Sequence, residues 1–196
     1  MQYIHAVLRL ALEQARHDEI VARNVAALVK APTVRLVEVV PYSTEQARVL
    51  LKTLQGDRLE ALYTLAVGIG LRRGELLGLT GQAVDLDEET LRVRRSLQRV
   101  NGQLTLVDPK TARSQRTLPL PGLCVQALRK QQDRQRVERG ESVTWGDEWG
   151  LVFTTSVGTP IEPRNLNRHF TTVAKRAGLP KLRFHPVCQA GVRHRL

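Results

Sequence analysis

The apolar residues of this chain change their spacing between residues 90 and 120, and this change limits the fold more than any other feature of the sequence. Before and after that segment, apolar residues recur every three or four positions, as they do in helices that bury one face. Within it, Leu91 and Val93 alternate with arginines, and Asn101-Gly102 has the composition of a tight hairpin turn. We therefore predict an α+β protein that is mainly helical and contains a small three-stranded antiparallel sheet.

The helical spacing predicts one helix over residues 2–17 and a second, shorter helix over residues 20–30. Residues 43–46 have the pattern of a capping box, which predicts that another helix begins there and ends near Leu54. The remaining predicted elements are helices over residues 58–67, from about 73, over 123–139 and over 163–177, and strands from residue 90, around 104–106, over 116–120 and over 151–153.

The charge of the chain favours a polyanionic partner. Lys and Arg number 30 against 19 Asp and Glu, which gives a formal net charge of +11. Such an excess attracts nucleic acid first and an anionic membrane surface second. The arginines are clustered, which favours nucleic acid, and the longest apolar stretch, Leu59 to Leu71, is too short to span a bilayer. We therefore expect nucleic acid as the partner and no membrane association.

The cysteines and histidines give no sign of a disulfide framework or a metal site. Cys124 and Cys188 are far apart in the sequence, which fits a reducing cytoplasm. The N-terminus has the pattern of an amphipathic helix rather than of a signal peptide. The histidines lack metal-ligand spacing, and the acidic run from Asp85 to Glu89 is more typical of a solvated turn than of a magnesium site. We expect no cofactor and no metal.

Two basic residues lie next to unusual backbone. Arg72 lies in the glycine-rich segment 68–79, at a junction between two predicted helices, where its guanidinium can bind two phosphate oxygens. The glycines there do not have dinucleotide-binding spacing, and the segment follows a helix rather than a strand. Lys110 lies in a loop between two predicted strands, from which it can reach a partner. Taken singly, each of these residues is more often an ordinary surface residue.

Four segments in order resemble the motifs of tyrosine recombinases of the phage integrase family. Residues 70–79 resemble the motif around the first catalytic arginine, and residues 109–111 resemble the hairpin that carries the catalytic lysine. Residues 153–170 resemble the segment that leads to the third motif, and residues 183–185 resemble the opening of that motif. The resemblance covers about residues 1–185.

The resemblance implies a metal-free reaction on double-stranded DNA, in which a tyrosine attacks the scissile phosphate and forms a 3′-phosphotyrosyl link. It implies that Arg72 binds the phosphate oxygens and that Lys110 is the general acid for the departing 5′-oxygen. His185 would assist proton transfer or hydrogen-bond the phosphate. We assign DNA binding to other basic residues as well: Arg73, Arg92, Arg94, Arg95, Arg99, Arg113, Arg116 and Arg164, and the basic side chains of the predicted helix over 123–139.

The sequence departs from the family pattern after His185. The family has a second arginine three residues after the histidine, and Cys188 occupies that position here. A thiol cannot supply a bidentate cation. The three tyrosines, Tyr3, Tyr42 and Tyr63, all precede the predicted sheet, so none matches the place of the nucleophile. We therefore predict a chain that binds DNA weakly and with strong salt dependence, and that neither cleaves nor joins it.

The resemblance divides the chain into four predicted parts. Residues 1–33 are the C-terminal remnant of a helical core-binding domain, 34–42 a linker, 43–185 a C-terminally truncated catalytic domain, and 186–196 a tail unrelated to the family. Two alternatives stay open. The chain could be a non-catalytic DNA-binding module that modulates a full-length recombinase, or a recombinase protomer could supply the missing tyrosine.

Overall fold

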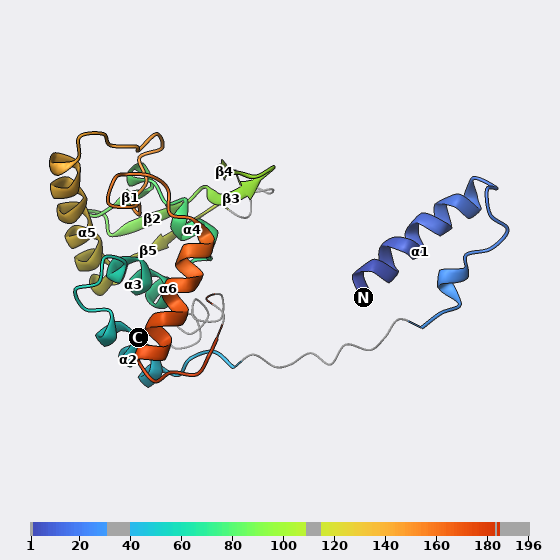
Figure 1. Cartoon of the computed structure of the whole chain (residues 1–196), viewed down its shortest axis with the longest axis horizontal. Coiled ribbons are helices and arrows are strands. Elements are labelled where there is room, and N and C mark those ends of the chain that lie inside the picture. The colour runs from blue at the N-terminus through green and yellow to red at the C-terminus, as the bar shows by residue number, and fades with distance from the viewer. Residues whose placement is uncertain (1, 31–39, 109–114, 183, 185–196) are drawn as a thin grey trace. The chain divides into compact units, whose positions relative to one another are not determined.

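The internal contacts divide the chain into two units, Met1–Val39 and Val40–Leu196 (Figure 1). The computed structural model describes residues 2–30, 40–108, 115–182 and 184. In the first unit, the helix predicted over residues 2–17 is confirmed as α1 (Gln2–His17). Several apolar side chains of α1 are exposed, including Ile4 and Leu10.

The helix predicted over residues 20–30 is wrong, because only a short 3-10 turn forms there, over Val25–Ala27. The Asn24 side chain explains the difference. Its oxygen accepts a hydrogen bond from the Ala27 N–H at 3.3 Å, and its nitrogen donates to the Arg9 carbonyl and the Glu13 carboxylate of α1. Asparagine thus caps the turn and ties the segment back to α1, in place of the hydrogen bonds of a longer helix.

The second unit begins with the predicted capping box. The Ser43 hydroxyl accepts from the Gln46 N–H, the Gln46 side chain accepts from the Ser43 N–H, and α2 (Thr44–Thr53) follows. α3 (Glu60–Ile69) begins two residues later than predicted, because the Asp57 side chain accepts from the Leu59 N–H at 2.8 Å and so forms a turn. The other predicted helices are confirmed as α4 (Arg73–Leu77), α5 (Gly122–Glu141) and α6 (Pro163–Arg176).

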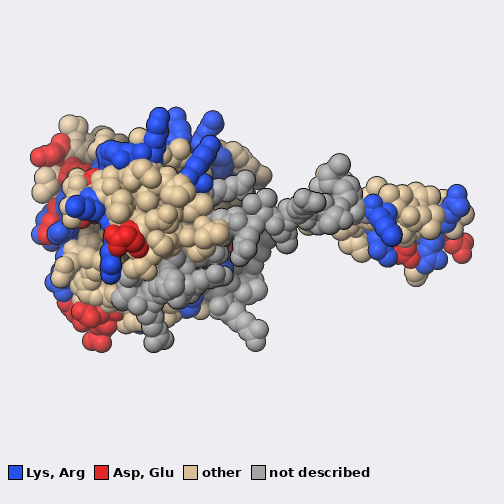
Figure 2. Space-filling model, turned by 90° about the horizontal axis from the view of Figure 1, so that it is seen from below, with Lys and Arg blue, Asp and Glu red and all other residues tan. Residues whose placement is uncertain are grey.

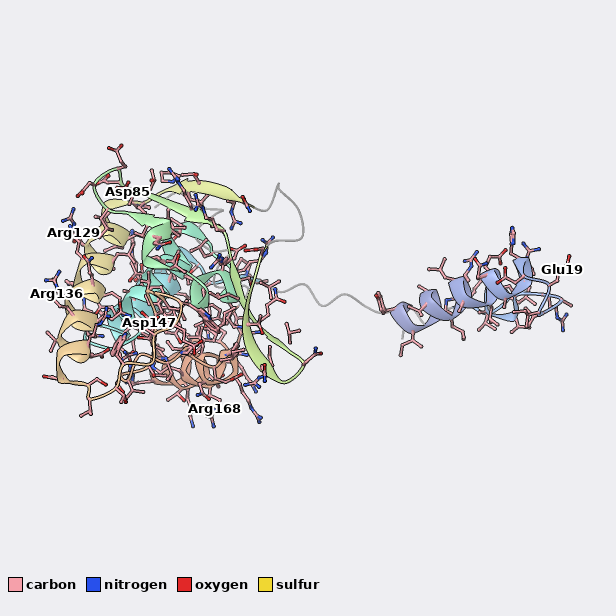
Figure 3. The ribbon with its side chains drawn as sticks, turned by 90° about the horizontal axis from the view of Figure 1, so that it is seen from above. Glu19, Asp85, Arg129, Arg136, Asp147 and Arg168 are labelled. Carbon is pink, nitrogen blue, oxygen red and sulfur yellow. The ribbon has the colours of Figure 1, made fainter. Side chains whose placement is uncertain are left out.

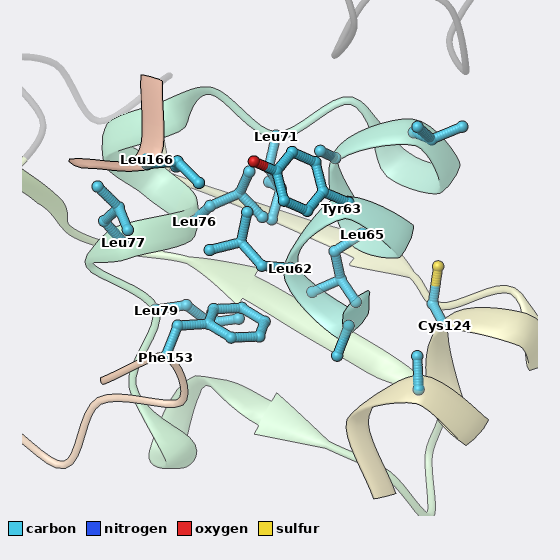
Figure 4. Close-up of a cluster of buried hydrophobic side chains, with 14 of the residues drawn as sticks. Leu62, Tyr63, Leu65, Leu71, Leu76, Leu77, Leu79, Cys124, Phe153 and Leu166 are labelled. Atoms are coloured by element: carbon cyan, nitrogen blue, oxygen red, sulfur yellow. The ribbon is translucent and has the colours of Figure 1, made fainter. Parts of the chain in front are cut away.

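α3 forms the centre of the core. Every residue from Ala61 to Val67 is buried, so the helix is covered on all sides. Figure 4 shows Leu62, Tyr63 and Leu65 of α3 among apolar side chains from α4, the 151–155 segment and α6. This helix is the long apolar stretch of the sequence, and the structure therefore confirms it as a core helix. No helix in the described part of the chain has the length and apolarity needed to cross a membrane.

The three-stranded antiparallel sheet is confirmed, but its strands are not all those predicted. It consists of β1 (Val84–Asp85), β2 (Thr90–Val93) and β5 (Arg116–Pro119), in the order β1-β2-β5. The acidic run forms the turn between β1 and β2, where the Asp85 carboxylate accepts from the Asp87 and Glu88 N–H groups.

The predicted first strand is interrupted after Val93. It resumes as β3 (Ser96–Val100), which pairs with β4 (Gln103–Val107) in a separate hairpin. Asn101 and Gly102 form the predicted turn with φ values of 48° and 81°. The alternation of buried residues stays in phase across the break, from Val93 to Leu97. The buried residues therefore keep the same parity, and the break is marked at residue 95, where an exposed arginine stands in place of a buried residue.

The strand predicted over residues 151–153 is wrong. Leu151 and Thr154 form only isolated bridges, to Thr80 and Pro160 respectively. The Val152 N–H donates to the Leu79 carbonyl, in the irregular loop that follows α4. That loop turns into a 3-10 segment at Gly81, so it offers no extended partner for a longer ladder.

Candidate nucleic-acid interface

Arg72 lies at the junction between α3 and α4. Gly70 ends α3 in the left-handed conformation with φ of 69°, which glycine adopts without strain. Arg72 then takes an extended conformation directly before α4 begins at Arg73. The exposed fraction of the Arg72 side chain is 67%. The junction therefore leaves this guanidinium accessible to solvent.

Glu75 hydrogen-bonds both the backbone and the side chain of Arg72. Its carboxylate accepts from the Arg72 backbone N–H at 2.9 Å and from the Arg72 guanidinium at 3.0 Å. It also accepts two hydrogen bonds from Arg116 of β5, at 3.1 and 2.9 Å. Burial raises the pKa of Glu75, but the hydrogen bonds from Arg116 and Arg72 outweigh it and hold the pKa below its ordinary value. Glu75 is thus a buried, charged link between α4 and β5.

A groove with a volume of about 980 Å³ runs between α4, β3 and the beginning of α6. Four predicted DNA-binding or catalytic residues line it, namely Arg72, Arg73, Arg99 of β3 and Arg164. Lys181, which follows α6, also lines it. Figure 2 shows Lys and Arg side chains gathered along one edge of the second unit. The fold therefore brings cations from four separate segments to one groove, which we call the basic groove.

The other predicted residues have different positions. Arg92 and Arg94 line a separate hollow over β2 and β5, and Arg95 pairs with Asp108 at 3.4 Å. Arg116 reaches Glu75 rather than the basic groove. These four arginines are therefore not brought together with Arg72 in the groove. Lys110, Arg113 and His185 lie outside the described residues.

The basic side chains of α5 are also separate from the basic groove. Figures 1 and 3 show α5 at the opposite end of the second unit from the β3–β4 hairpin. Its charges are largely engaged: Arg129 pairs with Asp87, Arg136 pairs with Asp133, and Arg134 donates to the Asp57 carbonyl. We therefore do not expect α5 to contact a ligand that lies in the groove.

Sequence reasoning missed two acidic residues and one lysine of this region. Glu75 had a recognisable signal. A glutamate three residues after the N-cap residue often accepts a hydrogen bond from the backbone N–H of that residue, as Glu75 does from Arg72. Glu162 and Lys181 had no local signal, because their proximity to Arg99 and Arg72 depends on how α6 packs.

Tyr42 and Tyr63 are both buried in the second unit. The Tyr42 hydroxyl donates to the Pro180 carbonyl at 2.8 Å, and the Tyr63 hydroxyl hydrogen-bonds His169 Nδ1 at 2.9 Å. Burial, followed by the charge of Asp57, raises the pKa of Tyr63 far above its ordinary range. Neither phenol is available to a ligand in the groove. Within the described residues, no group of three or more His, Cys, Asp or Glu side chains is arranged to bind a metal ion.

Gly74 of α4 and Gly78, which directly follows it, allow the β3–β4 hairpin to pack closely on this helix. A Cβ added at Gly78 would lie 2.7 Å from the Leu97 backbone nitrogen. We expect Gly78→Ala to lower the free energy of unfolding by about 1–3 kcal/mol, because the backbone of β3 must move. Gly140→Ala in α5 is the matched control, since nothing lies within 4 Å of its added Cβ. Urea unfolding measures both, and equal stability of the two variants would contradict the expectation.

The comparisons with known proteins agree with this fold. The family model described as the phage integrase family matches residues 42–194, a range that includes most of the tail predicted over 186–196. A "Tyrosine recombinase XerC-like" protein of Caldanaerobacter subterraneus subsp. tengcongensis is 37% identical over an alignment of 166 positions, gaps included, which covers 76% of this chain and 41% of that protein. An integrase of Streptomyces ambofaciens is 32% identical over 90% of this chain and 47% of its own length.

Solved structures share the fold. The Tn1549 transposon integrase, solved in complex with a circular intermediate DNA, superposes with a TM-score of 0.78 at 20% identity and covers 97% of this chain and 64% of that one. A lambda integrase dimer bound to a COC' core site gives a TM-score of 0.65 at 17% identity, over 97% of this chain and 64% of that one. The fold is therefore that of integrase catalytic domains. The chain belongs to the phage integrase family, and it spans about half the length of the curated relatives that it matches.

Proposed function

We propose that this chain binds duplex DNA through the basic groove and forms the phosphate-binding part of a tyrosine recombinase site. The observation that carries the proposal is the meeting of Arg72, Arg73 and Arg164 in one groove, together with Arg99 and Lys181. Cations from separate segments that share a groove can contact successive phosphates of one duplex. Membership of the phage integrase family and the DNA complexes of the Tn1549 and lambda integrases support it.

The surroundings of Arg72 support its proposed role in phosphate binding. Of its guanidinium nitrogens, one donates to Glu75, and this contact fixes the direction of the side chain. Arg72 lines the groove, and the planar fork of its guanidinium can bind two oxygens of one phosphate. Because Glu75 is held in turn by Arg116, the position of Arg72 is set before the ligand arrives.

We further propose that these 196 residues do not cleave DNA by themselves. The buried positions of Tyr42 and Tyr63 support this proposal, as does the predicted place of Cys188 where the family has its second arginine. The roles of Lys110 as general acid and His185 as a proton-transfer residue remain part of the proposal. We also propose a cytoplasmic location, which the unpaired and buried Cys124 supports.

Fluorescence anisotropy with a labelled 30-base-pair duplex tests DNA binding. We expect the affinity to fall steeply with salt, with a logarithmic slope of about −0.9 for each phosphate contacted. We expect Arg72→Ala to weaken binding about tenfold and to reduce the magnitude of that slope by about 1. Arg136→Ala on α5 is the control, because it removes the same charge outside the groove.

Two results would contradict the proposed interface. One is an affinity that does not depend on salt, since phosphate contacts release counterions. The other is an equal loss of affinity in Arg72→Ala and Arg136→Ala, since net charge alone would then explain the binding. Thermal melting of both variants checks that each is folded.

The alternative function, modulation of a full-length recombinase, uses the same groove. A chain that occupies a site with no available nucleophile would compete with an active protomer. Adding the chain to a related full-length recombinase and its site measures this competition as a lower yield of recombinant DNA. Adding instead a C-terminal fragment that carries a nucleophilic tyrosine tests whether a protomer partner can complete the site, in which case a covalent protein–DNA product appears.

A further inference from the structure

A single carboxylate lies among the cations of the basic groove. Of the described residues that line this groove, only Glu162 is acidic, and it lies directly before α6. The exposed fraction of its side chain is 30%, so it is accessible from the groove. An acidic side chain in this position repels a phosphate backbone, so its presence in a DNA-binding groove needs a structural explanation.

Glu162 is paired with Arg99 of β3. Arg99 Nε donates to Glu162 Oε1 at 3.4 Å, and a terminal nitrogen of the same guanidinium donates to Oε2. The other terminal nitrogen donates to the Gly102 carbonyl at the tip of the β3–β4 hairpin. All three nitrogens of Arg99 thus have acceptors within the protein. Three of the five N–H donors of Arg99 are thus occupied, and the edge formed by its Nε and one terminal nitrogen is not available to two oxygens of a phosphate.

We propose that Glu162 restrains Arg99 in the DNA-free protein, and that Arg99 exchanges Glu162 for a DNA phosphate when the phosphate enters the groove. This inference rests on the proposed function and adds a residue that determines how strongly the groove binds DNA. Two effects act in the same direction. The carboxylate occupies the Arg99 fork, and its negative charge repels the backbone of the incoming duplex.

The ion pair is suited to such an exchange. The exposed fractions of the Arg99 and Glu162 side chains are 50% and 30%, so water and a ligand can reach both groups. Exposed pairs of this kind are weak, and a phosphate can compete for the arginine. A phosphodiester, like a carboxylate, offers two oxygens that a guanidinium can bind together. Glu162 therefore acts as an internal competitor, and it weakens binding to DNA of any sequence.

The pair also joins two elements that line the groove, β3 and the start of α6. β3 rests on α4, where Leu97 lies against Gly78, and Arg99 extends from the same strand to the beginning of α6. Release of Arg99 frees the end of the β3–β4 hairpin from α6. We therefore expect faster amide hydrogen exchange over residues 96–107 when Glu162 no longer holds Arg99.

The test compares Glu162→Gln with Asp133→Asn. Each variant removes one negative charge from an ion pair with arginine, but Asp133 lies on α5, away from the groove. Against a 30-base-pair duplex of random sequence, we expect Glu162→Gln to bind about tenfold more tightly than the original chain and its salt slope to increase by about 0.9. We expect Asp133→Asn to change the affinity less than about twofold.

Arg99→Ala in each background separates the two effects. If Glu162 restrains Arg99, the double variant Arg99→Ala/Glu162→Gln loses most of the gain. If the gain persists without Arg99, repulsion alone explains it and the restraint is rejected. Glu162→Asp keeps the charge but shortens the side chain, and we expect it to raise the affinity by a smaller factor.

The remaining outcomes also decide the matter. Suppose that the original chain binds DNA with the expected salt dependence and that Glu162→Gln binds it equally well or more weakly. This inference is then wrong, and the proposed function stands. A wild-type chain that does not bind duplex DNA overturns both. Should Glu162→Gln lose its native melting transition, Glu162→Ala with and without Arg99→Ala provides the same comparison, because it also removes the carboxylate and leaves Arg99 as the variable.

Discussion

Incubation of this chain with a nicked duplex that traps phosphotyrosyl intermediates is expected to yield no covalent protein–DNA product. Tyr63 is fully buried and hydrogen-bonded to His169, and Tyr42 is buried and hydrogen-bonded to Pro180. A phenol that is closed off from solvent cannot attack a phosphate in the basic groove. Loss of the nucleophile typically lowers the rate by several orders of magnitude, since no other group forms the covalent intermediate. Denaturing gel electrophoresis of labelled DNA measures the product.

Tyr3 provides the control for this expectation. It belongs to the first unit, where 82% of its surface is exposed, and it is therefore the phenol that could react by chance. A shifted band that Tyr3→Phe removes would identify an incidental reaction. A shifted band that survives in Tyr3→Phe would mean that the nucleophile lies in the second unit, and our account of the buried tyrosines would then be wrong.

Glu75→Gln is expected to lower the free energy of unfolding by about 3 kcal/mol at neutral pH, because it removes the charge that balances Arg116. The amide retains the shape of the side chain but cannot accept both hydrogen bonds of Arg116 and those of Arg72 as a carboxylate does. Loss of one partner of a buried pair leaves the other without compensation. Urea unfolding measures the change. Glu45→Gln is the control, since the pair of Glu45 with Arg48 is exposed and is expected to contribute less than about 0.5 kcal/mol.

The same carboxylate makes the stability depend on pH. The pKa of Glu75 in the folded protein lies below its ordinary value of 4.5. Its contribution is therefore complete above the pKa of the unfolded chain and is lost as the pH falls through the lower pKa of the folded state. We expect the stability difference between the original chain and Glu75→Gln to be largest at neutral pH and to shrink in acid. A difference that stays constant below pH 4.5 would show that lost packing, and not lost charge, destabilises the variant.

The functional consequence of the Glu75 contact follows from its position. Glu75 joins Arg72 of the basic groove to Arg116 of β5, so a weakened contact leaves Arg72 free to adopt other rotamers. We therefore expect Glu75→Gln to weaken DNA binding as well as the fold. In this respect Glu75 differs from Glu162, whose replacement is expected to strengthen binding. Opposite signs for a glutamate that lines the groove, Glu162, and one that contacts Arg72 from outside it, Glu75, are difficult to explain by net charge alone.

The local sequence by itself determined most of the helices and the position of Arg72. The Ser43–Gln46 capping box, the proline that begins α6 and the glycines around Arg72 act through backbone within a few residues, and such effects can be recognised without knowledge of the fold. The apolar run of α3 likewise predicted a buried helix, because few other environments accept so many apolar residues in succession.

Only the tertiary structure decided which arginines share a groove. Arg92 and Arg99 both belong to the alternating segment, yet the break after Val93 directs β2 and β3 into different sheets, and only Arg99 reaches the basic groove. The same holds for Glu75 with Arg116, and for Glu162 with Arg99, which are pairs of residues 41 and 63 positions apart. Local spacing contains no information on such distances, because long-range contacts arise from the packing of whole elements around the α3 core.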